Sequence, residues 1–138
     1  MPDASFIYRW FEEVWNKKSE AAVDEMLAED GVGHGLPGGD IRGPESFKQY
    51  QRALVSAYPD LNVVVEDTMV EGDKIAARCR VTGIHQGEGL GLAATNKPVE
   101  FTGMCIIRVK DGKIVEAWNE FNFMEMYNQL GALTLNLQ

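Results

Sequence analysis

The C-terminal third of the chain holds the pattern that most restricts the fold: two alternating runs on either side of a tight turn. Residues 97–110 and 113–123 each alternate apolar and polar side chains, and Asp111 and Gly112 lie between them. An Asp-Gly pair between two such runs is a strong β-hairpin signal, because the turn needs positive φ angles that glycine adopts at little cost. The sequence therefore predicts a hairpin of two long strands near the end of the chain.

The second strand of this hairpin carries an unusual set of side chains. Because side chains alternate along a strand, Glu116, Trp118, Glu120 and Asn122 share one face, and the opposite face is mostly apolar. Two carboxylates, an indole and an amide on one face indicate the wall of a pocket. The same pattern is also typical of an exposed face, and the sequence leaves both interpretations open.

Helical patterns come before the strands. Large apolar side chains recur with helical spacing over residues 3–17, and Ser19 is placed to cap a second, short helix. A brief strand is expected around residues 32–36. Pro44 suits the first turn of a third helix, which Pro59 ends. From there the apolar spacing changes to two and predicts strands at 61–70, 74–86, 97–110 and 113–123.

Helices followed by antiparallel strands predict an α+β fold. The chain of 138 residues fits one domain, expected over residues 1–138. Long strands in a small domain must twist and curl to cover a core. We therefore expect a curved antiparallel sheet wrapped around the N-terminal helices, an α+β cone with an internal pocket. The opening at one end of such a cone is a natural small-molecule site.

Charge and composition narrow the partners. A net charge of −8 disfavours binding to nucleic acid or to anionic membranes. No apolar run is long enough to cross a bilayer, and the acidic, amphipathic N-terminus differs from a secretory signal, so a cytoplasmic location is expected. Cys79 and Cys105 lie on the apolar phase of strands and are predicted to be buried free thiols. The two histidines lack metal-site spacing and no phosphate loop is present, which predicts no metal and no cofactor.

Several segments follow one another in an order and spacing that carry more information than any one of them. They are 30–34 (DGVGH), 43–44 (GP), 57–61 (AYPDL), 65–73 (VEDTMVEGD), Arg78, 82–87 (TGIHQG), 95–102 and 108–131. Together they resemble the SnoaL-like polyketide cyclase and ester cyclase family, within the nuclear transport factor two-like, cystatin-like superfamily. The resemblance covers nearly the whole chain. It implies a homodimer formed through the outer face of the sheet, with an apolar, cone-shaped cavity in each subunit.

The resemblance also implies a chemistry. Characterised members of the family close a ring of a polyketide ester by an intramolecular aldol step without metal or cofactor. Their acid/base is an aspartate four residues after a tryptophan on the last strand. Here Trp118 matches the tryptophan, but Asn122 stands at the aspartate position, and an amide cannot take up a proton at neutral pH. This departure concerns the reaction and leaves the fold untouched.

Four residues are candidates for the chemistry. His34 stands where the family commonly has a cavity-facing histidine, and Glu120 shares the face of Asn122, so each could serve as the acid/base. Asn122 and Arg108 could steady an oxyanion. Each also has a structural alternative. His34 could be a loop histidine and Glu120 a solvated carboxylate. Asn122 could be a satisfied polar group at a strand end and Arg108 a member of a cross-sheet ion pair.

Further residues are predicted to contact the substrate or to support the fold. Trp118, Met104 and Trp10, together with Arg108, are the predicted substrate contacts, and core packing is their alternative. His85 matches the histidine of the family's Thr-Gly-Thr-His-Thr-Gly segment. It is predicted to be a structural, hydrogen-bonded residue at a strand end.

Three functions remain as hypotheses. The first is a cofactor-free cyclase, isomerase or related lyase that acts on an apolar, carbonyl-bearing, polyketide-like small molecule. The second is a dimeric domain that binds such a molecule without changing it, and it leaves open whether the chain is an enzyme at all. The third, a hydrolase on the same scaffold, has the least support, because the strands offer no clear pair of aspartates on a shared face.

Overall fold

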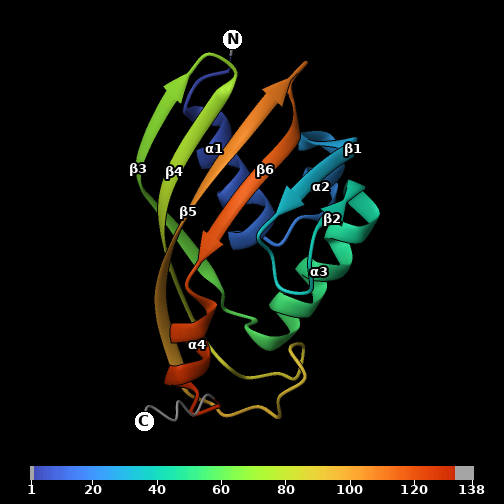
Figure 1. Cartoon of the computed structure of the whole chain (residues 1–138). Coiled ribbons are helices and arrows are strands. Elements are labelled where there is room, and N and C mark those ends of the chain that lie inside the picture. The colour runs from blue at the N-terminus through green and yellow to red at the C-terminus, as the bar shows by residue number, and fades with distance from the viewer. Residues whose placement is uncertain (1, 133–138) are drawn as a thin grey trace, which may run out of the picture.

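The computed structural model describes residues 2–132, in which six strands form one mixed sheet that curls around the helices (Figure 1). The helical elements are α1 (Ser5–Trp10), the π-helical segment η1 (Phe11–Asn16), α2 (Glu20–Met26), α3 (Gly43–Ala57) and α4 (Phe123–Gln129). The strands are β1 (Leu27–His34), β2 (Ile41–Arg42), β3 (Asn62–Glu71), β4 (Lys74–Ile84), β5 (Pro98–Lys110) and β6 (Lys113–Phe121). Their order in the sheet is β2-β1-β6-β5-β4-β3.

The predicted α+β fold is confirmed, with one difference in strand direction. The four long strands are antiparallel neighbours as expected, but β1 runs parallel to β6 and begins at Leu27, earlier than predicted. The two-residue β2 was not predicted. The expected domain over residues 1–138 includes residue 1 and residues 133–138, which lie outside the described residues, so its extent stays a prediction. No helix within residues 2–132 is long and apolar enough to span a membrane.

The predicted hairpin is present and contains an irregularity that sets the faces of β6. Asp111 and Gly112 have φ angles of 52° and 76°, as the tight turn requires. Arg108 pairs with Glu116 while its neighbour Val109 pairs with Ile114, so Val115 is an extra residue. The bulge places Ile114 inward and Glu116 outward, and the alternation continues from there to the end of the strand.

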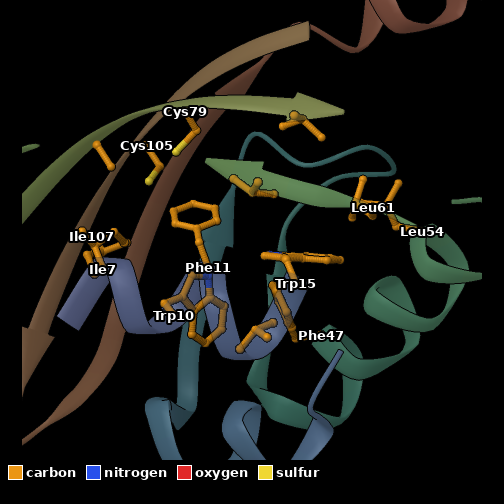
Figure 2. Close-up of a cluster of buried hydrophobic side chains, with 14 of the residues drawn as sticks. Ile7, Trp10, Phe11, Trp15, Phe47, Leu54, Leu61, Cys79, Cys105 and Ile107 are labelled. Carbon is orange, nitrogen blue, oxygen red and sulfur yellow. The ribbon is translucent and has the colours of Figure 1, made fainter. Parts of the chain in front are cut away.

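The first helical segment supplies several large aromatic side chains of the core. Phe11 lies against the sheet, whereas Trp10 and Trp15 pack against Phe47 of α3 (Figure 2). Cys79 and Cys105 approach Phe11 from neighbouring strands (Figure 2). Both cysteines are buried free thiols, as predicted, and burial raises the pKa of each to about 12. They are therefore protonated and unreactive at neutral pH.

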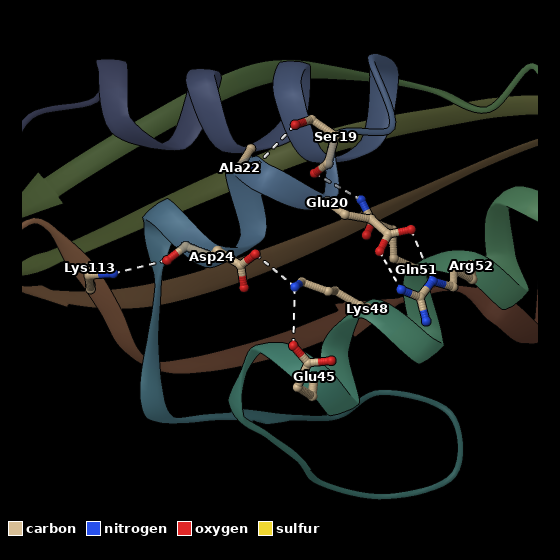
Figure 3. Close-up of polar contacts among 9 residues, drawn as sticks. All are labelled: Ser19, Glu20, Ala22, Asp24, Glu45, Lys48, Gln51, Arg52 and Lys113. Carbon is tan, nitrogen blue, oxygen red and sulfur yellow. Dashed lines mark hydrogen bonds and ion pairs between the residues drawn. The ribbon is translucent and has the colours of Figure 1, made fainter.

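Polar contacts connect α2 to α3 and to the β5–β6 hairpin (Figure 3). Ser19 caps α2 as predicted, because its Oγ accepts a hydrogen bond from the backbone N–H of Ala22 at 3.1 Å. Lys48 Nζ reaches Asp24 Oδ2 at 2.8 Å, and Lys113 Nζ donates to the backbone oxygen of Asp24 at 3.0 Å. These contacts hold the helices over the concave face of the sheet.

Candidate functional site

The helices and the concave face of the sheet enclose an apolar cavity of about 80 Å³. Its walls come from α1, η1, α3, the first residue of α4 and all six strands of the sheet. Two lining side chains, Asn119 and Tyr50, carry an amide and a phenol. Among the described residues, no aspartate, glutamate, histidine, lysine or arginine lines the cavity. The apolar part of the wall is formed chiefly by Trp10, Phe11, Trp15, Phe47, Leu54, Val81, Phe101, Ala117 and Phe121.

Asn119 is held in the cavity wall by a glycine-rich segment that follows β1. Its Nδ2 donates to the backbone oxygen of His34 at 3.0 Å. Gly35 has a φ of +79°, and a Cβ placed on it would lie 2.0 Å from the backbone oxygen of Asn119. Only a residue without a side chain permits this approach. The sequence GVGHG therefore fixes the position of the cavity amide.

Tyr50 places a neutral hydrogen-bond donor in the same cavity. It comes from α3, and its ring packs edge-on against Trp15, with ring centroids 5.7 Å apart. Burial raises the pKa of Tyr50, so the phenol keeps its proton at neutral pH. The cavity thus offers one amide and one phenol to a ligand, in an otherwise apolar surrounding.

The polar face of β6 points away from the cavity. Trp118 pairs with Ile106, and Glu120 pairs with Met104; all four lie on the convex face of the sheet, where Met104 is 58% exposed. Glu120 and Met104 line a hollow of about 430 Å³ on the convex face, where their role in a site stays a prediction. All three predicted residues lie outside the apolar cavity. The physical reason is that the concave face must be apolar to cover the helices, which leaves the polar phase for the convex face.

Asn122 stands at the end of β6 and caps the last helix. Its Oδ1 accepts a hydrogen bond from the backbone N–H of Glu125 at 3.1 Å, at the start of α4. Asparagine and aspartate are both favoured at this position of a helix. Asn122 is exposed and lies outside the apolar cavity, beside Glu120 in the hollow on the convex face. The alternative of a satisfied polar group at a strand end fits the structure, and a role of Asn122 in a site stays a prediction.

His34 belongs to a charged cluster on the convex side. Its Nε2 lies 2.8 Å from Glu116 Oε2 and its Nδ1 lies 3.1 Å from Asp40 Oδ2, while Arg108 bonds the other oxygen of Glu116 at 3.2 Å. The ring also lies beside Trp118, with centroids 5.9 Å apart. His34 and Arg108 were expected at the cavity, and the structure places both outside it. Their side chains hold β1, β6 and β5 together across the sheet.

We expect this cluster to make stability depend on pH. Hydrogen bonds to Glu116 and Asp40 raise the pKa of His34 above 6.5, and His34 and then Arg108 lower the pKa of Glu116 below 4.5. The histidine contributes fully to folding stability below pH 6.5, and this contribution is lost as pH rises through its raised pKa. The glutamate contributes fully to folding stability above pH 4.5, and this contribution is lost as pH falls through its lowered pKa. The pair is therefore complete between these two values.

The measurement compares the melting temperature of the wild type with that of His34→Gln across this range. The gap between them should be largest near about pH 5.5 and should shrink by about pH 8.5. Arg52→Gln, which removes an exposed ion pair with Glu20, serves as the control and should show no such narrowing. A gap that stays constant from acid to base would contradict the assignment of a charged His34–Glu116 pair.

The predicted structural role of His85 is confirmed, and two strand arginines also have structural roles. Arg78 and Arg80 form cross-strand ion pairs with Glu66 at 3.0 and 3.3 Å on the convex face. His85 is fully buried at the end of β4, and its Nδ1 lies 3.0 Å from Thr95 Oγ1. Neither arginine reaches the cavity, which is closed to them by the sheet.

Of the residues predicted to contact substrate, only Trp10 lies in the cavity wall, and the two polar lining residues were missed. Asn119 shares the phase of Ala117 and Phe121 on β6, so it is a single amide in an apolar row. That isolated polar residue on the apolar face was the available signal. Tyr50 belongs to the apolar side of α3, so its position gave no sign that its hydroxyl could serve a site.

Comparisons with known proteins agree on one family. The family model described as SnoaL-like polyketide cyclase matches residues 5–130. The solved structure of IdmH of Streptomyces antibioticus, a candidate polyketide cyclase, is similar, with 31% identity, a TM-score of 0.79 and coverage of 93% of this chain and 97% of that chain. None of the curated proteins compared with the chain matches it.

Two further solved structures are similar over most of the chain. A candidate polyketide cyclase of Bacillus cereus ATCC 10987 has 29% identity and a TM-score of 0.80, with 94% of this chain and 80% of that chain covered. A candidate SnoaL-like polyketide cyclase of Jannaschia sp. CCS1 has 22% identity and a TM-score of 0.84, with 94% and 92% covered. At that identity the second likeness supports the cone fold alone.

Proposed function

Because the chain belongs to the SnoaL-like polyketide cyclase family, we propose that it binds an apolar, carbonyl-bearing small molecule in its cavity and closes or isomerises a ring of that molecule without a cofactor. The observation that supports this proposal is the cavity itself, whose wall is apolar except for the amide of Asn119 and the phenol of Tyr50. An apolar pocket with a few well-placed polar groups is the usual form of a small-molecule site.

The lining also limits the mechanism. Within the described residues the wall offers no carboxylate or imidazole, so no strong base acts on the ligand from it. The substrate is therefore one that closes without such a base, for example a 1,3-dicarbonyl in its enol form: the enol carbon attacks a second carbonyl, and the enol proton passes to the new alkoxide oxygen. The wall holds the reacting atoms close together, and such positioning can be equivalent to an effective concentration of roughly 10⁵ M or more. Tyr50 and Asn119 donate hydrogen bonds to a carbonyl oxygen as negative charge develops on it.

The same lining favours one alternative. A cavity without an acid/base on its wall suits a protein that binds the molecule and releases it unchanged. The two functions share the site and the ligand class, and they differ only in whether the bound molecule reacts.

We also propose that the protein is a homodimer that uses the convex face of the sheet. A row of outward side chains crosses this face in register, and we call it the outer stripe: Met69, Ala76, Ile106 and Trp118. Met69 is 72% exposed, and an exposed row of apolar side chains is unusual on the surface of a single chain. Rows of mixed charge flank the stripe, so a second copy can lie on it without a net repulsion at the contact.

The proposed function is tested with linear aryl β-keto esters as candidate substrates. Products are followed by liquid chromatography and mass spectrometry, as new species of unchanged mass or of the mass left after loss of water. Ala117→Leu fills the cavity from its wall and should abolish turnover, whereas Thr102→Leu adds the same side chain to the convex face and should leave turnover unchanged.

Each outcome has one meaning. Turnover by the wild type and by Thr102→Leu, with loss in Ala117→Leu, supports an enzyme that acts in the cavity. Saturable binding with full recovery of every ester supports the binding protein instead. Turnover that is kept in Ala117→Leu contradicts the cavity as the site; if it is lost in Thr102→Leu, the result points to the convex hollow that Thr102 lines with Glu120 and Asn122.

A further inference from the structure

Two fully buried polar side chains at the end of the cone have a hydrogen-bonding atom without a partner among the described residues. They are Tyr58, through its hydroxyl, and His85, through Nε2. Both residues are 0% exposed. Buried polar atoms in native proteins are nearly always paired, so two unpaired atoms on neighbouring side chains require an explanation.

The contacts of His85 fix where its proton lies. The backbone N–H of Thr95 donates to Nδ1 at 3.2 Å, and Thr95 Oγ1, which accepts the N–H of Lys97 at 3.3 Å, lies 3.0 Å from the same atom. A backbone N–H can only donate, so Nδ1 is an acceptor and carries no proton. The proton of the ring is therefore on Nε2, which makes the unpaired atom a donor.

Tyr58 presents a second donor next to the first. Its ring lies against Gly83, where a Cβ would come within 3.2 Å of Cδ1, and its centroid is 5.4 Å from that of His85. Burial raises the pKa of Tyr58 to about 12, so its hydroxyl keeps a proton to donate. Two neighbouring donors without an acceptor are complementary to one oxygen atom with two lone pairs.

Neither donor lines the cavity, but each is joined to a residue that does. Val81, Gly83 and His85 follow one another on the concave phase of β4, and Val81 lines the cavity. The backbone N–H of Tyr58 bonds to the oxygen of Leu54, another lining residue.

The segment between β4 and β5 covers this end of the cone. Gln86 and Gly87 donate their backbone N–H groups to the oxygen of Ala57, at 3.0 and 3.2 Å. A Cβ on Gly87 or Gly89 would lie 1.8 or 1.7 Å from a backbone oxygen of the last turns of α3. The glycines thus let the segment lie directly on α3 and keep solvent from the donor pair.

We propose that Tyr58 and His85 bind the carbonyl or enolate oxygen of the ligand while its apolar body occupies the cavity. The inference rests on the proposed function and specifies it, because it assigns the end at which the ligand's oxygen lies. The two donors then act as a preformed oxyanion site in a region shielded from water. The same geometry would also hold one buried water molecule, so the experiment must separate a ligand oxygen from a water.

The probes are acetophenone and α-methylstyrene, which have nearly the same shape and differ in a carbonyl oxygen against a methylene group. Binding of each is followed by NMR titration of the full chain. The wild type should bind acetophenone roughly 10-fold more tightly, the value of about one buried hydrogen bond. Tyr58→Phe should reduce this preference, because only His85 can then donate to the oxygen, whereas Tyr8→Phe, which removes an exposed hydroxyl, should keep it.

Two further measurements do not depend on affinity. Nitrogen-15 NMR of His85 should show the tautomer with its proton on Nε2 and a shift of that nitrogen with acetophenone but not with α-methylstyrene. The melting temperature of Tyr58→Phe should be no lower than that of the wild type, because the hydroxyl loses no protein partner.

The remaining outcomes overturn the inference in distinguishable ways. Equal binding of both probes by the wild type contradicts the oxygen site and leaves the proposed function intact. A lower melting temperature of Tyr58→Phe with an unchanged preference indicates a buried water only. If the wild type binds neither probe, the proposed function fails together with this inference.

Discussion

Replacing Gly35 by alanine is expected to lower the free energy of unfolding by more than about 3 kcal/mol and to disorder the cavity wall. Gly35 has a φ of +79°, which costs an alanine about 1–2 kcal/mol. Its new methyl group would also lie 2.0 Å from the backbone oxygen of Asn119, a rigid atom within the sheet. Relief of this clash must move β1 away from β6, and the amide of Asn119 would move with it.

Gly38→Ala is the matched control. Gly38 has a φ of +91° and nothing within 4 Å of its Cβ position, so it adds the conformational cost without the clash. Urea unfolding should show a loss of about 1–2 kcal/mol for this variant, clearly less than for Gly35→Ala. Equal losses in the two variants would contradict the close approach of Gly35 to Asn119, and with it the account of how the amide is held.

The elements of the fold could be predicted because each has a local cause. Asp111 and Gly112 specify the hairpin turn, Ser19 caps α2, and the change of apolar spacing near Leu61 marks the start of the long strands. The pairing of β1 with β6 has no such local signal, because a parallel pair joins segments that lie far apart in the sequence.

The candidate site was harder to predict, because alternation defines two faces without saying which one is concave. The carboxylates, indole and amide of β6 suggested a pocket wall, but they lie on the convex face. The bulge at Val115 lies in the same strand and shifts the alternation on which the assignment of the faces depended. The concave face needs apolar side chains to cover the helices, so its candidate functional residue is the exception in the apolar row, Asn119. In a cone of this kind the informative polar residue is the isolated one.

The two faces of β6 therefore have separate tasks. Ala117, Asn119 and Phe121 form cavity wall, whereas Trp118 faces outward in the outer stripe. This division explains how an asparagine can occupy the position of the family's aspartate: at Asn122 the side chain caps α4, a task that either residue performs. The departure at this position thus bears on the convex side and leaves the cavity unchanged.

Replacing Ile106 by aspartate is expected to convert the proposed dimer into a monomer. Ile106 lies in the middle of the outer stripe, between Ala76 and Trp118, and is 44% exposed in the single chain. In a symmetric dimer each substitution occurs twice, so two carboxylates would be brought into one apolar contact. A desolvated charge without a partner costs several kcal/mol, and we expect dimerisation to weaken by more than about 100-fold.

Light scattering after size-exclusion chromatography measures this directly. The mass of the wild type should be twice that of the chain, and the mass of Ile106→Asp should equal that of one chain with unchanged circular dichroism. Met124→Asp, at a 62% exposed position of α4 away from the sheet, should remain a dimer. A wild type that is monomeric at every concentration, or an Ile106→Asp variant that still dimerises, would show that the outer stripe serves another purpose.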